Sequence, residues 1–185
     1  MSEPEQEEQR AVNQDNSAPV QSGVKRYQLR QKMVSLGQDY WIENEHGEKV
    51  YKVDGKVFTI HKTFFFEDAH GKKLAKLKKL ILTLKEIIEI EGPDGEQLAK
   101  VTKDLFTPLK EHFVVKVKNS PDLEIHGNIL DHEYSINNEN QKIAQVSKKW
   151  LSIRDSYAVE IEPGQDDVLV LAIVTSIDEM THGTR

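Results

Sequence analysis

The sequence predicts a mainly β domain in which about a dozen short strands form a barrel or a sandwich. Three observations support this fold class: a repeat with a period of 24 residues, a polar turn in each copy, and apolar–polar strands on both sides of each turn. The chain has 185 residues, a length that fits one domain with a substantial core.

The first 23 residues differ from the rest and are expected to be a disordered acidic tail. Of the net charge of −6, a share of −4 falls on residues 1–23. This segment has almost no large apolar side chain, so it cannot offset the entropy that ordering would cost. It also has neither the basic start nor the apolar stretch of a signal peptide. We therefore expect a single folded domain over residues 24–185.

The repeat accounts for the middle of the chain. Three copies align over residues 39–62, 63–86 and 87–110, and a shorter fourth copy starts near Tyr134. In each of the three full copies a glycine supplies the positive φ that a tight hairpin turn needs. These glycines are Gly47, Gly71 and Gly95.

Two more reversals are expected after the full copies. Residues 126–127, His-Gly, lie between two short apolar segments and are typical of a turn. Residues 155–156, Asp-Ser, separate two expected strands at 150–154 and 157–161. With two strands for each repeat unit, these segments give about twelve strands in all.

The C-terminal segment has a different pattern. Residues 168–174, VLVLAIV, carry no charge, and Asp166 and Asp167 precede them as expected at a helix N-terminus. A helix over residues 166–182 would be apolar all round at its start, which predicts burial. It is too short for a bilayer span. Because valine and isoleucine abound, a buried strand remains an alternative that periodicity does not decide.

Several short motifs, taken in their order along the chain, resemble those of a known family. They are YQLR at 27–30, DGEQLAKV at 94–101, SKKW at 147–150, YAVEI at 157–161 and LAIVTSID at 171–178. With the repeat, they make the chain similar to the LURP-one-related family of the tubby-like C-terminal superfamily, which includes the phospholipid scramblases. The resemblance implies a closed antiparallel barrel of about twelve strands around one central hydrophobic C-terminal helix.

The resemblance also carries expectations about function. It implies no catalytic residue, and it points to membranes, because related tubby domains bind phosphoinositides and scramblases act on bilayers. No lipid-binding residue of those relatives can be aligned with a position in this chain. The cysteine-rich acylation stretch typical of scramblases is missing as well, since the sequence has no cysteine.

The first candidate binding site is an acid-free basic segment at residues 72–85. Lysines near an anionic membrane surface contribute about 1 kcal/mol each to binding. Leucines at helical spacing would allow a basic amphipathic helix, but alignment with the other repeats favours strands. The alternative is a solvated barrel face whose lysines prevent edge pairing. The candidate ligands for lipid or phosphate here are Lys72, Lys73, Lys76, Lys78 and Lys79.

The second candidate site combines cations with a tryptophan. A tryptophan among basic residues is typical of a membrane interface or of a site for a phosphate-bearing ligand. The alternative is a tryptophan of the core or the barrel wall, because this residue is highly buried on average. The residues concerned are Lys148, Lys149, Trp150 and Arg154.

Other chemistries find little support in the sequence. The seven histidines form no metal-binding spacing, and the motifs of hydrolases, P-loop proteins and dinucleotide-binding proteins are missing. The acidic balance argues against a nucleic-acid partner. We therefore expect no enzyme, no metal and no cofactor.

The sequence thus predicts a cytoplasmic binding module that contacts the inner membrane surface peripherally, without a transmembrane segment. Its lysine-rich strand faces would bind anionic phospholipid head groups or a phosphorylated ligand. One alternative is a protein-interaction scaffold with the acidic tail as the recognition segment. A third hypothesis is a hydrolase that uses histidines and carboxylates outside the barrel.

Overall fold

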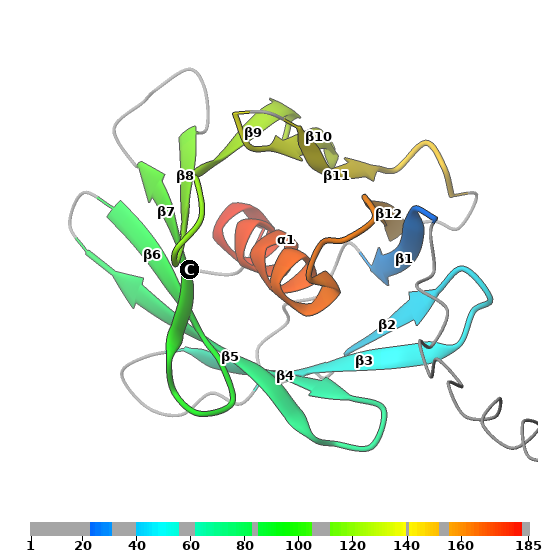
Figure 1. The fold of residues 1–185 in the computed structure, drawn as a ribbon, viewed down its shortest axis with the longest axis horizontal. Coiled ribbons are helices and arrows are strands. Elements are labelled where there is room, and N and C mark those ends of the chain that lie inside the picture. Colours follow the sequence, from blue (N-terminus) through cyan, green and yellow to red (C-terminus); the bar gives the residue numbers. More distant parts are fainter. Residues whose placement is uncertain are drawn as a thin grey trace, which may run out of the picture.

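The structure is a computed structural model that describes residues 23–30, 40–55, 62–82, 85–104, 112–139, 141–151 and 156–182. These residues form twelve strands and one helix (Figure 1). The first six strands are β1 (Lys25–Arg30), β2 (Tyr40–Asn44), β3 (Lys49–Asp54), β4 (Thr63–Asp68), β5 (Lys73–Ile81) and β6 (Lys85–Glu91). They are followed by β7 (Gln97–Asp104), β8 (His112–Val117), β9 (Leu123–Asn128), β10 (Glu133–Asn137), β11 (Lys142–Ser147), β12 (Ser156–Ile161) and the helix α1 (Asp167–His182).

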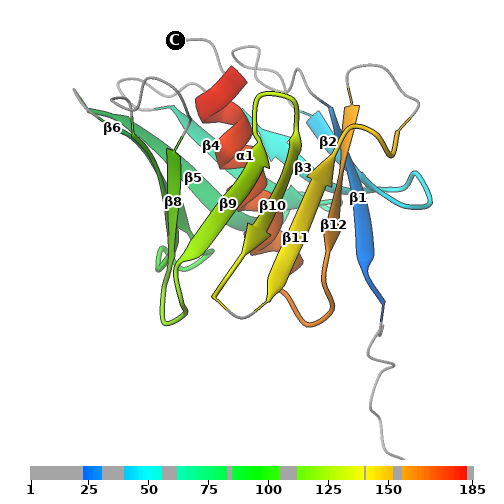
Figure 2. The same ribbon diagram turned by 90° about the horizontal axis from the view of Figure 1, so that it is seen from above.

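The strands form a closed antiparallel barrel. Each strand pairs with its neighbours in sequence, and β1 pairs with β12 to complete the ring. All odd-numbered strands therefore run in one direction and all even-numbered strands in the other. We call the end at which the odd-numbered strands finish the upper rim, and the opposite end the lower rim. The helix follows β12, begins at the lower rim and ends at the upper rim (Figure 2).

The repeat glycines make the turns that the sequence predicts. Gly47, Gly71 and Gly95 have φ values of 76°, 81° and 82°, and all three lie in lower-rim hairpins. The first two turns are supported in the same way. The side chain of Asn44 accepts hydrogen bonds from the backbone of His46 and Glu48, and Asp68 does so from residues 70 and 72.

The predicted reversal at residues 126–127 is wrong. Gly127 lies inside β9, opposite Tyr134 of β10, and the chain turns after Asn128. The glycine serves a close approach between strands, because a Cβ at this position would lie 2.4 Å from the carbonyl oxygen of Glu133. Gly127 does have a positive φ, 128°, but within β9, and His132 in the turn that follows has a φ of 53°.

The helix fills the barrel and supplies the centre of the core (Figures 1 and 2). Residues 170–180 are all buried, among them Leu171 and Ile173 with no exposed surface. They pack with inward-facing strand residues such as Leu29, Phe66 and Leu77. The barrel wall thus takes the place of lipid around an apolar helix, so the helix predicted from the C-terminal segment is confirmed. Among the described residues, no helix has the length and apolarity that a bilayer crossing requires.

Polar contacts fix both ends of the helix. At the lower rim, Asp166 accepts a hydrogen bond from the backbone of Leu169, and Asp167 receives the Lys25 ammonium at 2.7 Å and the Tyr27 hydroxyl at 2.8 Å. At the upper rim, Lys103 donates to the carbonyl of Met180, one of the groups that a helix C-terminus leaves without an intrahelical partner.

Candidate functional site

The outward lysines of β5 lie in a ladder of alternating charge. Lys76 pairs with Glu91 of β6 at 2.9 Å, and Lys78 lies opposite Glu89 in the strand register. Glu89 in turn faces Lys100 of β7 at 3.7 Å. The acid-free run in the sequence is therefore next to acids in space, as expected of a solvated barrel face.

The other lysines of this segment have different surroundings. Lys72 and Lys73 are exposed at the lower-rim end of the strand, where the Lys73 ammonium lies 3.9 Å from the centroid of the Phe65 ring. Lys79 points into the barrel and is 4% exposed. It belongs to a buried ion-pair network, so its ammonium is not accessible to a ligand at the barrel surface.

The two basic segments are far apart on the barrel. Strands β5 and β11 are six positions apart in the ring of twelve, whichever way the ring is followed. Lys72 and Lys73 are at the lower rim, whereas Lys148, Lys149 and Trp150 follow β11 at the upper rim. The structure therefore does not combine the two candidate sites into one.

The turn that carries Lys148 and Lys149 is anchored by Glu133 of β10. The Glu133 carboxylate accepts hydrogen bonds from the Ser147 hydroxyl at 2.9 Å and from the backbone of Lys148 and Lys149 at 3.0 and 3.2 Å. Burial alone would raise the pKa of Glu133, but these hydrogen bonds outweigh it and hold the pKa below its ordinary value. The turn is thus fixed while the Lys149 side chain stays 80% exposed.

Trp150 belongs to the same turn, although a strand was expected to begin there. Its ring lies 5.5 Å from the guanidinium carbon of Arg26 on β1, a cation–π contact. Arg26 also pairs with Glu160 of β12. Trp150 as a whole is 37% exposed, so the tryptophan lies on the barrel wall and still faces solvent. Arg154, the last member of this candidate set, is outside the described residues.

A buried ion-pair network lies at the C-terminal end of the helix. Lys79 of β5 contacts Glu179 at 3.1 Å and Glu86 of β6 at 3.2 Å, and Lys62 contacts Glu179 at 3.3 Å. All but Lys62 are nearly inaccessible to solvent. The network joins the helix to two strands, and it explains how four charged groups persist inside an apolar barrel.

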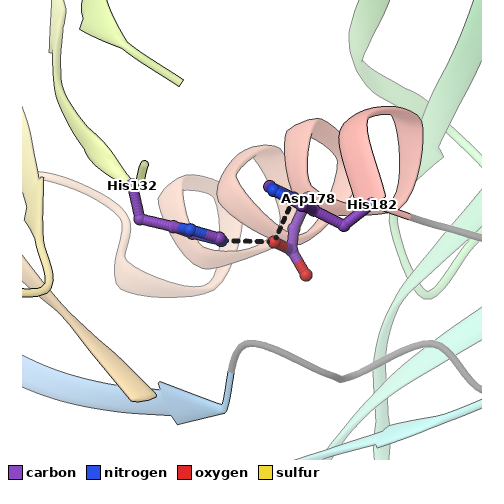
Figure 3. A group of neighbouring side chains, drawn as sticks. All are labelled: His132, Asp178 and His182. Atoms are coloured by element: carbon purple, nitrogen blue, oxygen red, sulfur yellow. Dashed lines mark hydrogen bonds and ion pairs between the residues drawn. The ribbon is translucent and has the colours of Figure 1, made fainter. Parts of the chain in front are cut away.

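A second polar cluster, His132–Asp178–His182, lies at the same end (Figure 3). One oxygen of Asp178 is 2.6 Å from Nε2 of His132 and 3.2 Å from Nδ1 of His182. The hydrogen bond with Asp178 raises the pKa of His182 above its ordinary value. The ring of His132 is stacked between those of Tyr157 and His182.

Comparison with known proteins agrees with this architecture. The family model for LURP-one-related proteins matches residues 25–178. This chain belongs to the LURP-one-related family. An X-ray structure of a protein from Arabidopsis thaliana shares the fold of this LURP-one-related barrel, with a TM-score of 0.63 and 17% sequence identity over 87% of this chain and 93% of that chain. No curated protein sequence matches the chain.

Neither cluster inside this LURP-one-related barrel is predicted by the sequence. One signal was present: Asp178 and His182 are four residues apart and share a helix face. His132 carried no comparable signal, because its contact with Asp178 spans 46 positions. Lys79 lies in a run of lysines whose other members are at the surface. Only the alternation along the strand indicates that it points inward, because it shares a strand face with the buried residues Ala75 and Leu77.

Proposed function

We propose that this protein is a non-enzymatic, cytoplasmic module that binds anionic phospholipid head groups at the inner membrane surface. The contact would be made at the upper rim by the turn of Lys148, Lys149 and Trp150, which we call the basic turn. The observation that carries the proposal is this turn itself. Two lysines and a solvent-facing tryptophan are presented together on a backbone that Glu133 holds in place.

The apolar surface supports the choice of the upper rim. The large hydrophobic side chains exposed among the described residues are Val24, Leu82, Leu130 and Trp150. Three of these follow odd-numbered strands, so their backbone lies at the upper rim, although the ring of the third extends along the wall to Arg26: Leu82, Leu130 and Trp150. Apolar tips beside lysines suit the boundary between head groups and acyl chains.

The β5 lysines are weaker candidates for the same ligand. Lys76 and Lys78 face the acids of β6, and Lys79 is turned inward. Lys72 and Lys73 are exposed but lie at the opposite rim, so a flat membrane that meets the basic turn does not reach them. They therefore provide a matched control rather than a second half of the site.

The proposal can be tested by co-sedimentation of the full-length protein with vesicles of phosphatidylcholine alone or with phosphatidylserine. We expect binding to the anionic vesicles only, and weaker binding at physiological salt because the charges are exposed. At about 1 kcal/mol for each lysine, the variant K148Q/K149Q should bind roughly thirtyfold less tightly than the parent. The control K72Q/K73Q removes the same charge at the lower rim and should bind like the parent.

Three outcomes would contradict the proposal. Equal losses in the two double variants would indicate a general charge effect, and equal binding to neutral vesicles would exclude head-group recognition. Absence of vesicle binding would leave the lysines as a solvated surface and favour a protein-interaction scaffold. The chain without residues 1–23 tests in addition whether the acidic tail competes with lipid, in which case its removal strengthens binding.

A further inference from the structure

The His132–Asp178–His182 cluster has the composition of a metal site. Figure 3 shows the two imidazoles directed at one carboxylate, with His132 from the turn between β9 and β10 and the other two from the C-terminal end of the helix. One ligand atom from each residue lies within 4.8 Å of the other two. The two histidine rings are stacked at 4.6 Å with an interplanar angle of 14°.

The surroundings orient His182 as they do in metal proteins. Its Nε2 donates to the carbonyl oxygen of Leu130 at 3.2 Å, which leaves Nδ1 directed at Asp178. Histidine ligands commonly donate their second ring nitrogen to a backbone carbonyl, which fixes the ring and its tautomer. When Nδ1 carries a proton it donates to Asp178, and when it has lost that proton its lone pair can bind a cation at the same place.

The hydrogen bonding of the cluster is incomplete. Oδ2 of Asp178 and Nδ1 of His132 are among the buried side-chain atoms of the described residues that have no hydrogen-bond partner. Both side chains are only 2% exposed. A buried carboxylate oxygen without a donor is costly, and a cation held by both oxygens of Asp178 would satisfy Oδ2.

The donor set indicates which cation fits. Two imidazole nitrogens and one carboxylate oxygen suit Zn²⁺ and related transition metals, whereas Ca²⁺ and Mg²⁺ prefer oxygen ligands alone. Tetrahedral ligands about 2 Å from Zn²⁺ lie about 3.3 Å from one another. The distance from Oδ1 of Asp178 to Nδ1 of His182, 3.2 Å, already matches this ligand separation. The distance from the same oxygen to Nε2 of His132, 2.6 Å, has to increase when the ion binds.

We propose that His132, Asp178 and His182 bind one divalent transition-metal ion, with Zn²⁺ as the best-matched occupant. The three residues leave a fourth position for water, and the side chain of His182, 25% exposed, gives a way in from the upper rim. The ion would link the end of the helix to the β9–β10 turn. It is a site within the barrel, distinct from the basic turn on its surface.

The test uses the full-length protein after treatment with a chelator. Zn²⁺ is titrated by isothermal calorimetry, and Co²⁺ is added separately to follow its visible absorption. We expect one ion per chain, a cobalt spectrum of a low-coordinate nitrogen–oxygen site, and a rise in Tm with Zn²⁺. In H182Q the affinity should fall by at least about tenfold, since even the loss of an outer hydrogen-bond partner costs 10–100-fold.

The chain offers a matched control for this experiment. His126 and Glu124 form a second contact between an imidazole and a carboxylate, with Nε2 and Oε2 3.0 Å apart. Both residues are exposed on β9 and form no part of the cluster. H126Q should therefore bind Zn²⁺ like the parent. H182Q changes a partly exposed residue in the last helical turn, and its circular dichroism spectrum verifies that it folds. Failure of the parent to bind a stoichiometric ion, or equal binding by H182Q and the parent, would refute the site.

Discussion

Replacing Lys79 by methionine tests whether this lysine belongs to the core rather than to a ligand surface. Methionine keeps most of the aliphatic stem and removes the ammonium that contacts Glu86 at 3.2 Å and Glu179 at 3.1 Å. Of the two carboxylates, Glu179 would then keep its contact with Lys62, whereas Glu86 would lose its contact with the Lys79 ammonium. Removing one partner from a buried ion pair typically costs about 3–5 kcal/mol, because the remaining charge is left uncompensated.

The decrease in the free energy of unfolding can be measured by urea denaturation, with tryptophan fluorescence as the signal. For a chain of this size, 3–5 kcal/mol corresponds to a decrease in Tm of roughly 6–20 °C. Lys78 is the matched control, because it is adjacent in β5 and points outward. K78M should change the free energy of unfolding by no more than about 0.5 kcal/mol.

A double variant separates charge from packing. K79M/E86Q removes one charge of each sign and leaves the pair of Lys62 with Glu179. If uncompensated charge is the cause, the double variant should be more stable than K79M by about 1 kcal/mol or more, within the usual range of coupling energies for contacting residues. If K79M unfolds like K78M, or if E86Q destabilises K79M further, the interpretation of Lys79 as a buried ion-pair partner is wrong.

Two further predictions concern groups at the two rims. D166A should lower the free energy of unfolding by about 1 kcal/mol, because it removes the side chain that accepts from the backbone of Leu169, and chemical denaturation checks this. E133Q should destabilise the protein by about 1–3 kcal/mol at pH 7. Because the folded pKa of Glu133 lies below the ordinary value of 4.5, its contribution is complete above that pH and is lost as the pH falls through 4.5 toward the folded pKa. The difference from the parent should therefore shrink in acid, and a difference that stays constant from pH 7 to pH 3 would contradict the assignment.

The parts of the fold that depend on local patterns could be predicted from the sequence. The turns at Gly47, Gly71 and Gly95 follow from a backbone geometry that few residues other than glycine adopt. The apolar segment of α1 was ambiguous, because a buried helix and a buried strand can share a composition. Family resemblance, rather than periodicity, resolved it. Gly127 was misassigned because glycine also serves close strand contacts, which depend on the partner strand.

The sites were harder to predict because they depend on distant neighbours. The sequence showed a basic run around Lys76, but the balancing charge of Glu91 comes from the pairing of two strands. Likewise, Glu133 could not be linked to the basic turn before β10 and β11 were paired. Charge along a chain therefore indicates little about charge on a barrel wall.

The position of α1 after all twelve strands has a consequence for biosynthesis. While the chain grows from the ribosome, each hairpin can form as soon as its second strand emerges, since neighbouring strands in sequence are neighbours in space. The apolar inner surface of the wall, however, has no partner until the helix has also left the exit tunnel. Translation that stops between β12 and α1 would release a sheet whose apolar inner surface is exposed. Chaperones bind such a species, and without them it aggregates.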